Sequence, residues 1–268
     1  MSDFDITIQY TRRYNNKIKQ ICAPLFNHLG YNGLVYHYIS NDGHATSFGS
    51  DIPSFEYYYY NNFHLINPFI RHPRYFQTGV LAVNDVKDVA YKSSLRSQEE
   101  KYDLGYRFIF FEKLEHGCQG FSFSAPKYVP TPLTDLPLLN RFVGHFKTEA
   151  KPILDKILED QRRIDRLLGP VFDTKPIIPQ ETKRQAQLAF LQQLGIIHSP
   201  EDLALSPREK NCIQLLLLGY SASQIADALT LSKRTVETYL DNLKFKTHCA
   251  NKLELVTKFR EIDQLGLL

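Results

Sequence analysis

The spacing of apolar and polar residues divides the chain into a front part of mixed elements and a helical end. Apolar residues recur at helical spacing over residues 17–29, and Gly30 and Gly33 follow them, so a helix is predicted there. The aromatic and β-branched run at 34–39 predicts a strand, and the residues at 40–43 predict a turn after it. Helical and strand-like patterns keep alternating up to about residue 125.

Three further segments complete the predicted sheet. Residues 80–89 form a weaker strand candidate, whereas 106–114 and 119–124 are typical strands joined by a hairpin at 116–117. In the last of these, two phenylalanines alternate with two serines, which predicts one buried face and one polar face. We therefore predict a central antiparallel sheet with helices on its faces, an α/β/α sensor-like layout of the PAS or GAF kind.

The middle of the chain is predicted to be helical and then to open into a linker. An apolar stripe runs through residues 133–168, where Pro152 either starts a new helix or kinks the existing one. Gly169 and Pro170 end this helical stretch. Prolines mark 171–179 as a linker, and residues 180–194 fit one further helix before the last domain.

Capping chemistry predicts four helices in the last part of the chain. Two of them begin with a capping box, in which a serine is followed three residues later by glutamate or glutamine. Only the turn at 229–231 separates the second helix from the third, which predicts a helix-turn-helix. The residues at the four helix starts are Ser206, Ser221, Ser232 and Asn251.

The third of these helices has the pattern of a recognition helix. Val236, Leu240 and Leu243 recur at helical spacing, so we expect them to face the core. The remaining positions form a short polar face that can reach the edges of bases. The whole chain is thus predicted to be α+β, with an α/β/α domain followed by an all-α domain of four helices.

Composition and charge fit a globular chain with a local site for nucleic acid. The 268 residues are 43% hydrophobic and 23% charged, and the net charge of +3 is too small for a generally basic binding surface. Residues 201–268 hold nine basic and nine acidic residues. A monomer should therefore bind DNA weakly at physiological salt, which favours a homodimer on two half-sites.

Other signals point to a cytoplasmic chain with no metal or cofactor. The four cysteines are scattered, without a CxxC pair or zinc-ligand spacing, so neither a disulfide framework nor a metal site is predicted. The N-terminus lacks the pattern of a signal peptide, and no apolar run reaches the ~20 residues that span a bilayer. We expect no membrane partner and no bound cofactor.

A series of motifs runs through the last part of the chain. They include Leu205-Ser206-Pro207-Arg208-Glu209, Gly219-Tyr220-Ser221, Gln224-Ile225-Ala226, Leu231-Ser232 and Thr235-Val236-Glu237. Together they resemble the LuxR/FixJ-type helix-turn-helix. The resemblance covers about residues 203–268 and implies double-stranded DNA as a partner.

The resemblance implies three sets of DNA contacts. At the helix N-terminus, Ser232, Lys233, Arg234 and Thr235 would contact phosphates. Lys244 and Lys246 would add contacts to the DNA backbone. Glu237, Thr238 and Asp241 lie where the family reads bases, and an acidic side chain there could accept from the amino group of cytosine.

Some of these positions have a plainer explanation or depart from the family. Glu237 and Asp241 lie one turn apart and repel phosphate, unless Asp241 simply pairs with a neighbouring lysine. Tyr239 stands where histidine is common and Thr247 where leucine is common, so we expect either an unusual target sequence or a weak intrinsic affinity for DNA. For Arg208 and Glu209, helix-start chemistry and packing are the more frequent roles.

The front domain resembles the autoinducer-binding domains that precede LuxR-type helix-turn-helices, over about residues 15–165. That family carries a tryptophan, a tyrosine and an Asp-Pro pair at fixed spacing. Counted back from Asn67-Pro68, the tyrosine is Tyr58, the tryptophan is replaced by Ser54 and the aspartate by Asn67. Asparagine accepts a hydrogen bond without a charge, so the signal need not be an acyl-homoserine lactone.

The same stretch is rich in aromatic residues, which suits a cavity lined by rings with a few polar tips. The alternative is that these rings fill the core between a helix and the sheet. His64, Arg71 and His72 either meet an anionic ligand or lie on the surface. The candidate ligand contacts are Tyr57, Tyr58, Asn67, Phe69 and Ser124.

The sequence therefore predicts a LuxR-type regulator with three parts. Residues 1–169 form a sensory or dimerisation domain like the autoinducer-binding domains, 170–200 a linker with a short helix, and 201–268 the DNA-binding domain. The regulator would bind specific DNA sequences as a homodimer under the control of a small-molecule effector.

Three alternatives differ in the role of the front domain. It could serve as a ligand-free dimerisation or partner-binding module, with residues 133–168 as the interface. Control by phosphorylation would require an early acidic pair and an aspartate after a buried strand, and no segment combines them. An enzyme is not predicted, because the sequence has no HExxH, GxSxG, P-loop or GxGxxG motif.

Overall fold

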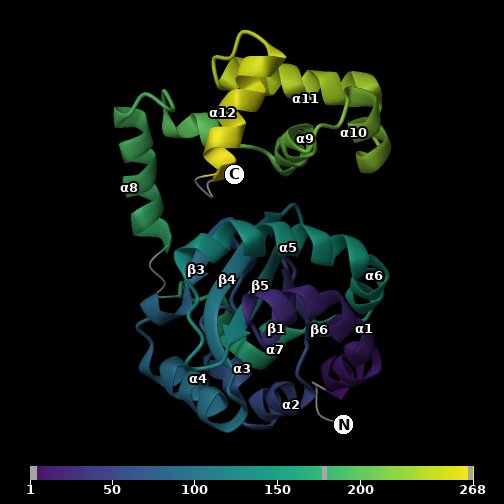
Figure 1. The fold of residues 1–268 in the computed structure, drawn as a ribbon, viewed down its shortest axis with the longest axis vertical. Coiled ribbons are helices and arrows are strands. Elements are labelled where there is room, and N and C mark those ends of the chain that lie inside the picture. The colour runs from purple at the N-terminus through teal and green to yellow at the C-terminus, as the bar shows by residue number, and fades with distance from the viewer. Residues whose placement is uncertain (1–4, 177–179, 265–267) are drawn as a thin grey trace. The chain divides into compact units, whose positions relative to one another are not determined.

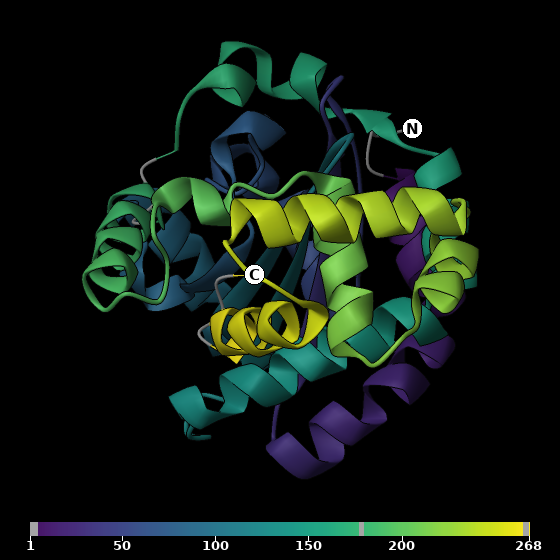
Figure 2. The same cartoon turned by 90° about the horizontal axis from the view of Figure 1, so that it is seen from above.

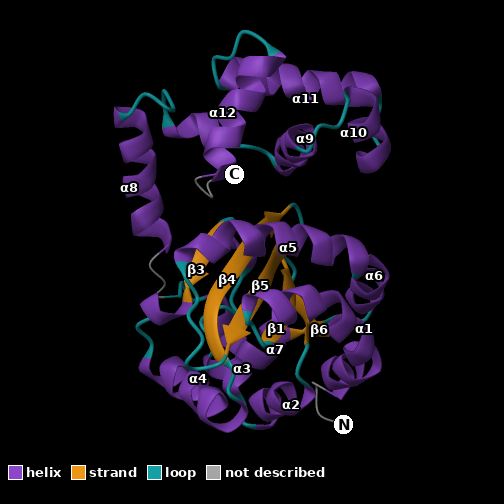
Figure 3. Ribbon diagram, viewed as in Figure 1, coloured by secondary structure: helices purple, strands orange, loops and turns teal. Residues whose placement is uncertain are grey.

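The chain folds into two compact units, each with its own hydrophobic core. The computed structural model describes residues 5–176, 180–264 and 268. The units are Met1–Pro179 and Gln180–Leu268, as Figure 1 shows by colour along the chain. The first is mixed α and β and the second is helical (Figure 3). Within the described residues, no helix is long and apolar enough to cross a membrane.

A six-stranded antiparallel sheet forms the centre of the first unit, in the order β3-β4-β5-β1-β2-β6. Its middle strands, β1 and β5, pair along their whole length, from Gly33 opposite Ser124 to Ser40 opposite Gly117. The strand bounds are β1 Gly33–Ser40, β2 His44–Gly49, β3 Gly79–Ala82, β4 Gly105–Leu114, β5 Gly117–Ala125 and β6 Arg162–Arg163.

The three stronger strand predictions are confirmed, and two differences have local causes. The weak candidate at 80–89 is a strand only in β3, because a 3-10 turn follows and Asp88 caps a new helix by accepting from the Tyr91 amide. Strand β2 was not predicted. It forms because the turn ending at Gly43, with φ +84°, folds the chain back on β1.

Helices α1 (Asp5–Leu29), α5 (Leu136–Glu149) and α6 (Lys151–Glu159) pack on one face of the sheet. Helices α1 and α5 lie side by side in both Figure 1 and Figure 2. Pro152 stands near the start of α6, so the predicted break in the long helical stretch is present. The shared core includes Leu25, Tyr36, Phe48, Phe121, Phe123 and Phe146.

Helices α2 (Ile52–Tyr60), α3 (Phe63–Ile66) and α4 (Val89–Tyr102) belong to the opposite side of the sheet, where Phe69, Tyr91 and Phe111 form a second cluster. On β5 the serine face is therefore buried as well as the phenylalanine face. Ser122 is 8% exposed and Ser124 is fully buried. The alternation predicted a polar face correctly, but that face borders the second helical layer and not the solvent.

The chain after α6 stays with the first unit. It forms β6 on the edge of the sheet, then α7 (Ile164–Leu168) and a 3-10 turn at Gly169–Asp173 that buries Phe172 near Ile39. The predicted helical stretch is thus interrupted by β6 after α6, and it resumes in α7, which ends at Leu168 directly before Gly169, as predicted. The predicted helix at 180–194 is α8 (Gln180–Gln193), which contributes Leu191 to the core of the second unit.

The second unit contains the predicted four helices: α9 (Pro207–Leu217), α10 (Ala222–Leu229), α11 (Lys233–Lys246) and α12 (Lys252–Gln264). Both predicted capping boxes are present, at Ser206 with Glu209 and at Ser221 with Gln224. Asn251 caps α12 by accepting from the amide of Glu254. The glycine predicted to end α12, at position 266, lies outside the described residues.

Candidate nucleic-acid interface and ligand cavity

A tight turn holds α10 and α11 together and fixes the outer face of α11. Thr230 takes the left-handed conformation at φ +55°, and the Leu231 amide donates back to the Ala226 carbonyl at 2.9 Å. Val236 and Leu243 are fully buried and Leu240 is 9% exposed, as the spacing predicted. The polar residues of α11 therefore lie on the side away from the core.

The N-terminus of α11 offers unpaired amides to an anion. Ser232 caps the helix by accepting from the Thr235 amide at 3.0 Å, and the two hydroxyls lie 2.7 Å apart. The amides of Lys233 and Arg234 occupy the first two helical positions, where a helix provides no acceptor. This is the arrangement that binds phosphate oxygens, with the positive end of the helix dipole behind it.

The charges on α11 are largely paired within the helix. Lys233 lies 3.6 Å from Glu237, and Lys244 lies 2.8 Å from Asp241. The pairing of Asp241 with a neighbouring lysine, expected as an alternative, is therefore present. Among the cations described on this helix, Arg234 has no ion-pair partner, so it is the one whose charge is not already compensated.

Lys246 has a structural partner inside the unit. Its ammonium lies 2.8 Å from the Glu209 carboxylate, whose side chain is 5% exposed. Burial opposes ionisation of Glu209, but hydrogen bonds from Lys246 and Ser206 outweigh it and hold the Glu209 pKa below its usual range. Glu209 therefore serves the helix start and the core, and its pairing competes with the phosphate contact predicted for Lys246.

Two short helices on a tight turn, the second with a polar outer face, define a helix-turn-helix domain of the DNA-binding type. Residues 203–259 match the model of the family described as bacterial regulatory proteins, luxR family. The C-terminal domain is thus a LuxR-family helix-turn-helix, as the motifs predicted.

Relatives with curated names match stretches of different length in this chain. The quorum sensing-dependent transcriptional regulator VjbR of Brucella ovis and of Brucella melitensis is 38% identical over 52 residues. The match spans only 20% of VjbR and 19% of this chain. The probable transcriptional regulator ycf29 of Cyanophora paradoxa is 26% identical over 169 residues, 59% of this chain and 76% of ycf29.

A solved structure resembles the chain over most of its length. SdiA of Escherichia coli covers 94% of this chain and 91% of its own, at 17% identity and a TM-score of 0.42. This score is too low to establish a common fold, so the fold is defined by the chain's own elements.

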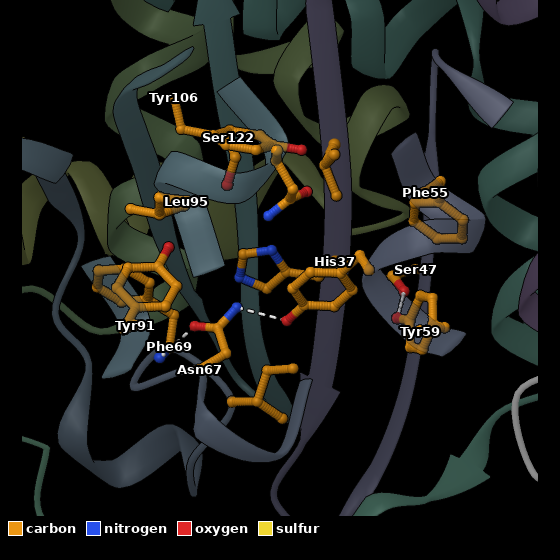
Figure 4. Close-up of a pocket in the computed structure, with 14 residues that line it drawn as sticks. His37, Ser47, Phe55, Tyr59, Asn67, Phe69, Tyr91, Leu95, Tyr106 and Ser122 are labelled. Atoms are coloured by element: carbon orange, nitrogen blue, oxygen red, sulfur yellow. Dashed lines mark hydrogen bonds between the residues drawn. The ribbon is translucent and has the colours of Figure 1, made fainter. Parts of the chain in front are cut away.

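The first unit holds a cavity of about 70 Å³ between the sheet and helices α2 and α4 (Figure 4). Its wall combines aromatic rings with a few polar tips, and none of its described residues is acidic, lysine or arginine. The lining residues are Val35, His37, Ser47, Phe55, Tyr58, Tyr59, Asn67, Phe69, Ile70, Tyr91, Leu95, Gln98, Tyr106 and Ser122.

His37 forms the centre of the sheet-side wall. Figure 4 shows its imidazole between Ser122 and Asn67. Gly120 lies opposite His37 on β5 and leaves room for the ring, since a Cβ at position 120 would come within 2.2 Å of it. Burial lowers the pKa of His37 to about 4, so the ring is neutral at physiological pH.

Tyr58 and Asn67 form a bonded pair on the opposite wall. The Asn67 amide donates from Nδ2 to the Tyr58 hydroxyl at 2.8 Å, and its Oδ1 accepts from the Phe69 amide at 2.9 Å. Burial raises the pKa of Tyr58 well above its ordinary value, so the hydroxyl keeps its proton. A backbone amide can only donate, so the Phe69 contact fixes which end of the Asn67 side chain faces Tyr58.

Three of the five predicted ligand contacts, Tyr58, Asn67 and Phe69, lie in the cavity wall. The structure moves the other two away. Tyr57 is one residue earlier on α2 and turns instead toward Tyr102 and the Ser97 hydroxyl. Ser124 is two residues beyond Ser122 on the same face, where its hydroxyl donates to Asn32.

The sequence reasoning missed His37, Gln98 and Tyr106. The sequence did contain a signal for His37. It lies two residues from both Val35 and Ile39, so the three side chains share one face of the predicted strand. Gln98 and Tyr106 join the wall only through tertiary packing. His64, Arg71 and His72, considered either for an anionic ligand or for the surface, do not line this cavity. The guanidinium of Arg71 donates instead to the carbonyls of Asn67 and Ile70.

Proposed function

We propose that the chain is a sequence-specific transcriptional regulator that binds double-stranded DNA as a homodimer. In this proposal an uncharged small molecule in the cavity of the first unit controls the DNA binding. The observation that carries the proposal is the LuxR-family helix-turn-helix of residues 203–259 with its exposed polar face on α11. VjbR and ycf29, which are named as transcriptional regulators, share sequence with parts of this chain.

Within this proposal, the N-terminal turn of α11 holds the phosphate and the following turns read bases. The amides of Lys233 and Arg234, the unpaired Arg234 guanidinium and the hydroxyls of Ser232 and Thr235 contact the backbone. Lys233 and Lys244 join them by exchanging their intrahelical partners for phosphate. Glu237, Thr238 and Asp241 face the base edges. Lys246 contributes to DNA binding by holding α11 in position through its ion pair with Glu209, more than by contacting phosphate.

The charge of residues 201–268 supports the homodimer in this proposal. The basic and acidic residues of 201–268 cancel, nine against nine. One domain then neutralises few phosphates and gains little from released counterions. Two copies on a two-fold symmetric site double the contacts without any increase in net charge.

The cavity supports control by an uncharged ligand. Its described wall carries no ionised side chain, because the one titratable base, His37, is neutral. A charged ligand would lose its hydration without a counter-charge, which costs several kcal/mol. Aromatic walls with convergent polar tips are typical of small-molecule sites.

The test of DNA binding is selection from random duplex DNA by the full chain and by residues 180–268, the compact second unit. Arg234→Ala is the control that should lose affinity for all sequences. We expect an enriched two-fold symmetric site. If only residues 180–268 enrich a sequence, the front unit restrains the domain. If neither enriches a sequence, the proposal fails.

The test of ligand control is a cavity-filling substitution, Ser122→Phe. If an effector binds in the cavity, a cell extract that contains it should change the affinity of the parent chain for operator DNA. The Ser122→Phe variant should bind the same DNA with an affinity that the extract leaves unchanged. Equal behaviour of the variant and the parent chain would favour the alternative, in which the front unit only dimerises. In that case Leu138, which is 52% exposed on α5, would be the first interface residue to substitute.

A further inference from the structure

We propose that the ligand of the cavity is an uncharged molecule with two anchors: a carbonyl oxygen that accepts from the Tyr58 hydroxyl, and a hydroxyl that donates to the His37 imidazole. This ligand class rests on the proposed function. It differs from an acyl-amide signal, which the family's aspartate would hold by accepting from the amide N–H.

The first step is the direction of the hydrogen bond between Asn67 and Tyr58. Asn67 Oδ1 is held by the Phe69 amide, so Nδ2 faces Tyr58 and the tyrosine oxygen is the acceptor. An aspartate at position 67 would have no proton to give and would instead accept from the tyrosine. The asparagine therefore reverses the polarity of this pair.

The second step is the free proton on Tyr58. Its hydroxyl oxygen already accepts from Asn67, and it donates to none of the described residues. A buried O–H without an acceptor is costly, by about 1–3 kcal/mol. Because Tyr58 lines the cavity, a ligand oxygen placed there would satisfy it. The side chain therefore selects a hydrogen-bond acceptor and offers nothing to an amide N–H.

The third step is the imidazole of His37. Neither of its nitrogens makes a hydrogen bond with a described residue, and the ring stands at the centre of the cavity wall (Figure 4). A neutral imidazole has one nitrogen that accepts and one that donates. Its unprotonated nitrogen can therefore accept a hydrogen bond from a ligand hydroxyl. A carboxylate ligand would need a cation, and no described residue of the wall is lysine or arginine.

The fourth step is the shape of the space between these anchors. Aromatic residues supply much of the wall, from α2, α4, β4 and the α3–β3 connection. A planar ring can lie against such walls at offset or edge-to-face angles. The six aromatic side chains of the wall are Phe55, Tyr58, Tyr59, Phe69, Tyr91 and Tyr106. An aromatic ketone that carries a hydroxyl group meets all three requirements: a carbonyl oxygen for Tyr58, a hydroxyl for His37 and a planar ring between the aromatic walls.

The experiment uses three matched probes on the full chain, with dissociation constants measured by ligand-observed NMR titration at pH 7.5. The first probe, 4-hydroxyacetophenone, has the carbonyl and the hydroxyl on a planar ring. The second, 4-hydroxybenzoate, replaces the ketone with a carboxylate. The third, 4-hydroxyacetanilide, adds an amide N–H. We expect the ketone to bind at least about tenfold more tightly than the carboxylate.

Two substitutions test the anchors, each with a control. Tyr58→Phe should weaken ketone binding by about threefold to tenfold, as should His37→Phe, which removes both ring nitrogens. Tyr57→Phe is the matched control for Tyr58, because its hydroxyl contacts Ser97 outside the cavity wall, and it should leave binding unchanged. Equal losses in Tyr57→Phe and Tyr58→Phe would mean a structural effect and would overturn the proposal.

Asn67→Asp tests the reversed polarity directly. The new carboxylate should accept hydrogen bonds from the Tyr58 hydroxyl and from a ligand amide N–H, so the preference for ketone over acetanilide should shift by about tenfold toward acetanilide. An unchanged preference overturns the proposal. So does failure of the ketone to bind the parent chain. In that case the effect of Ser122→Phe on DNA binding still decides separately whether the cavity controls the regulator.

Discussion

Lys246 and Glu209 join the end of the recognition helix to the start of α9 through an ion pair of 2.8 Å, in which the Glu209 side chain is 5% exposed. The same carboxylate accepts from the Ser206 amide at 2.8 Å and so completes a capping box. One buried acid therefore sets both the start of a helix and the position of α11. Lys246 therefore has a structural role that does not depend on any contact with DNA.

Lys246→Met should lower the free energy of unfolding of the second unit by about 1–2 kcal/mol, because it leaves a buried carboxylate without its cation. Urea unfolding at pH 7 measures this. The control is Lys244→Met, which removes an ion pair to an exposed aspartate and should cost less than about 0.5 kcal/mol. Equal losses in the two variants would contradict the structural role of Lys246.

The Lys246–Glu209 pair should also respond to pH with a definite sign. The Glu209 pKa is lower in the folded state, so its contribution is present above its usual pKa of about 4.5. The contribution is lost as pH falls through the folded pKa. Glu209→Gln should therefore lose more stability, relative to the parent chain, at pH 7 than at pH 3. A constant difference would count against the ion pair.

Arg234→Ala and Thr238→Ala should affect DNA binding in different ways. Arg234 lies at the helix N-terminus without an ion-pair partner, so its loss should weaken binding to all sequences and reduce the salt slope by about one. Thr238 donates to the Arg234 carbonyl at 2.9 Å and is one of the residues proposed to read bases, so its loss should relax preference at one base position. The measurement is affinity for a panel of single-base operator variants at several salt concentrations.

Gly120→Ala should close the cavity and destabilise the first unit by about 1–3 kcal/mol. A Cβ at position 120 would lie 2.2 Å from the His37 ring, which must then leave its place in the wall. Thermal unfolding and probe binding give the two readouts. Gly144→Ala is the control, since a Cβ there meets nothing within 4 Å on α5, and it should be neutral or stabilising. Retained binding in Gly120→Ala would be incompatible with a wall centred on His37.

The first unit should lose stability as pH falls from about 6.5 to about 4. Burial lowers the pKa of His37 and of His64 from 6.5 to about 4, so the unfolded chain takes up protons in this range before the folded chain does. Above pH 6.5 neither histidine binds a proton in either state. His37→Gln should flatten the slope between pH 6.5 and 4 in urea unfolding, and an unaltered slope would refute its assignment as a buried neutral base.

Local signals predicted most of the second unit. Helix starts at Ser206 and Ser221 are fixed by hydrogen bonds that reach only three residues along the chain, so the sequence contains both partners. The same holds for the core positions of α11, where helical spacing alone separates the buried face from the exposed one. The ion pair between Glu209 and Lys246 could not be predicted from local sequence, because these residues are 37 positions apart.

In the first unit, the sequence by itself determined the main strands and the polar alternation of β5, because both depend on neighbouring residues. Only the tertiary structure decided that the serine face borders a cavity, since this needs helices from residues 52–102 to cover it. It also decided that His37 stands at the centre of the wall, through the space left by Gly120 on another strand. Long-range packing, which no local pattern encodes, formed the cavity from these residues.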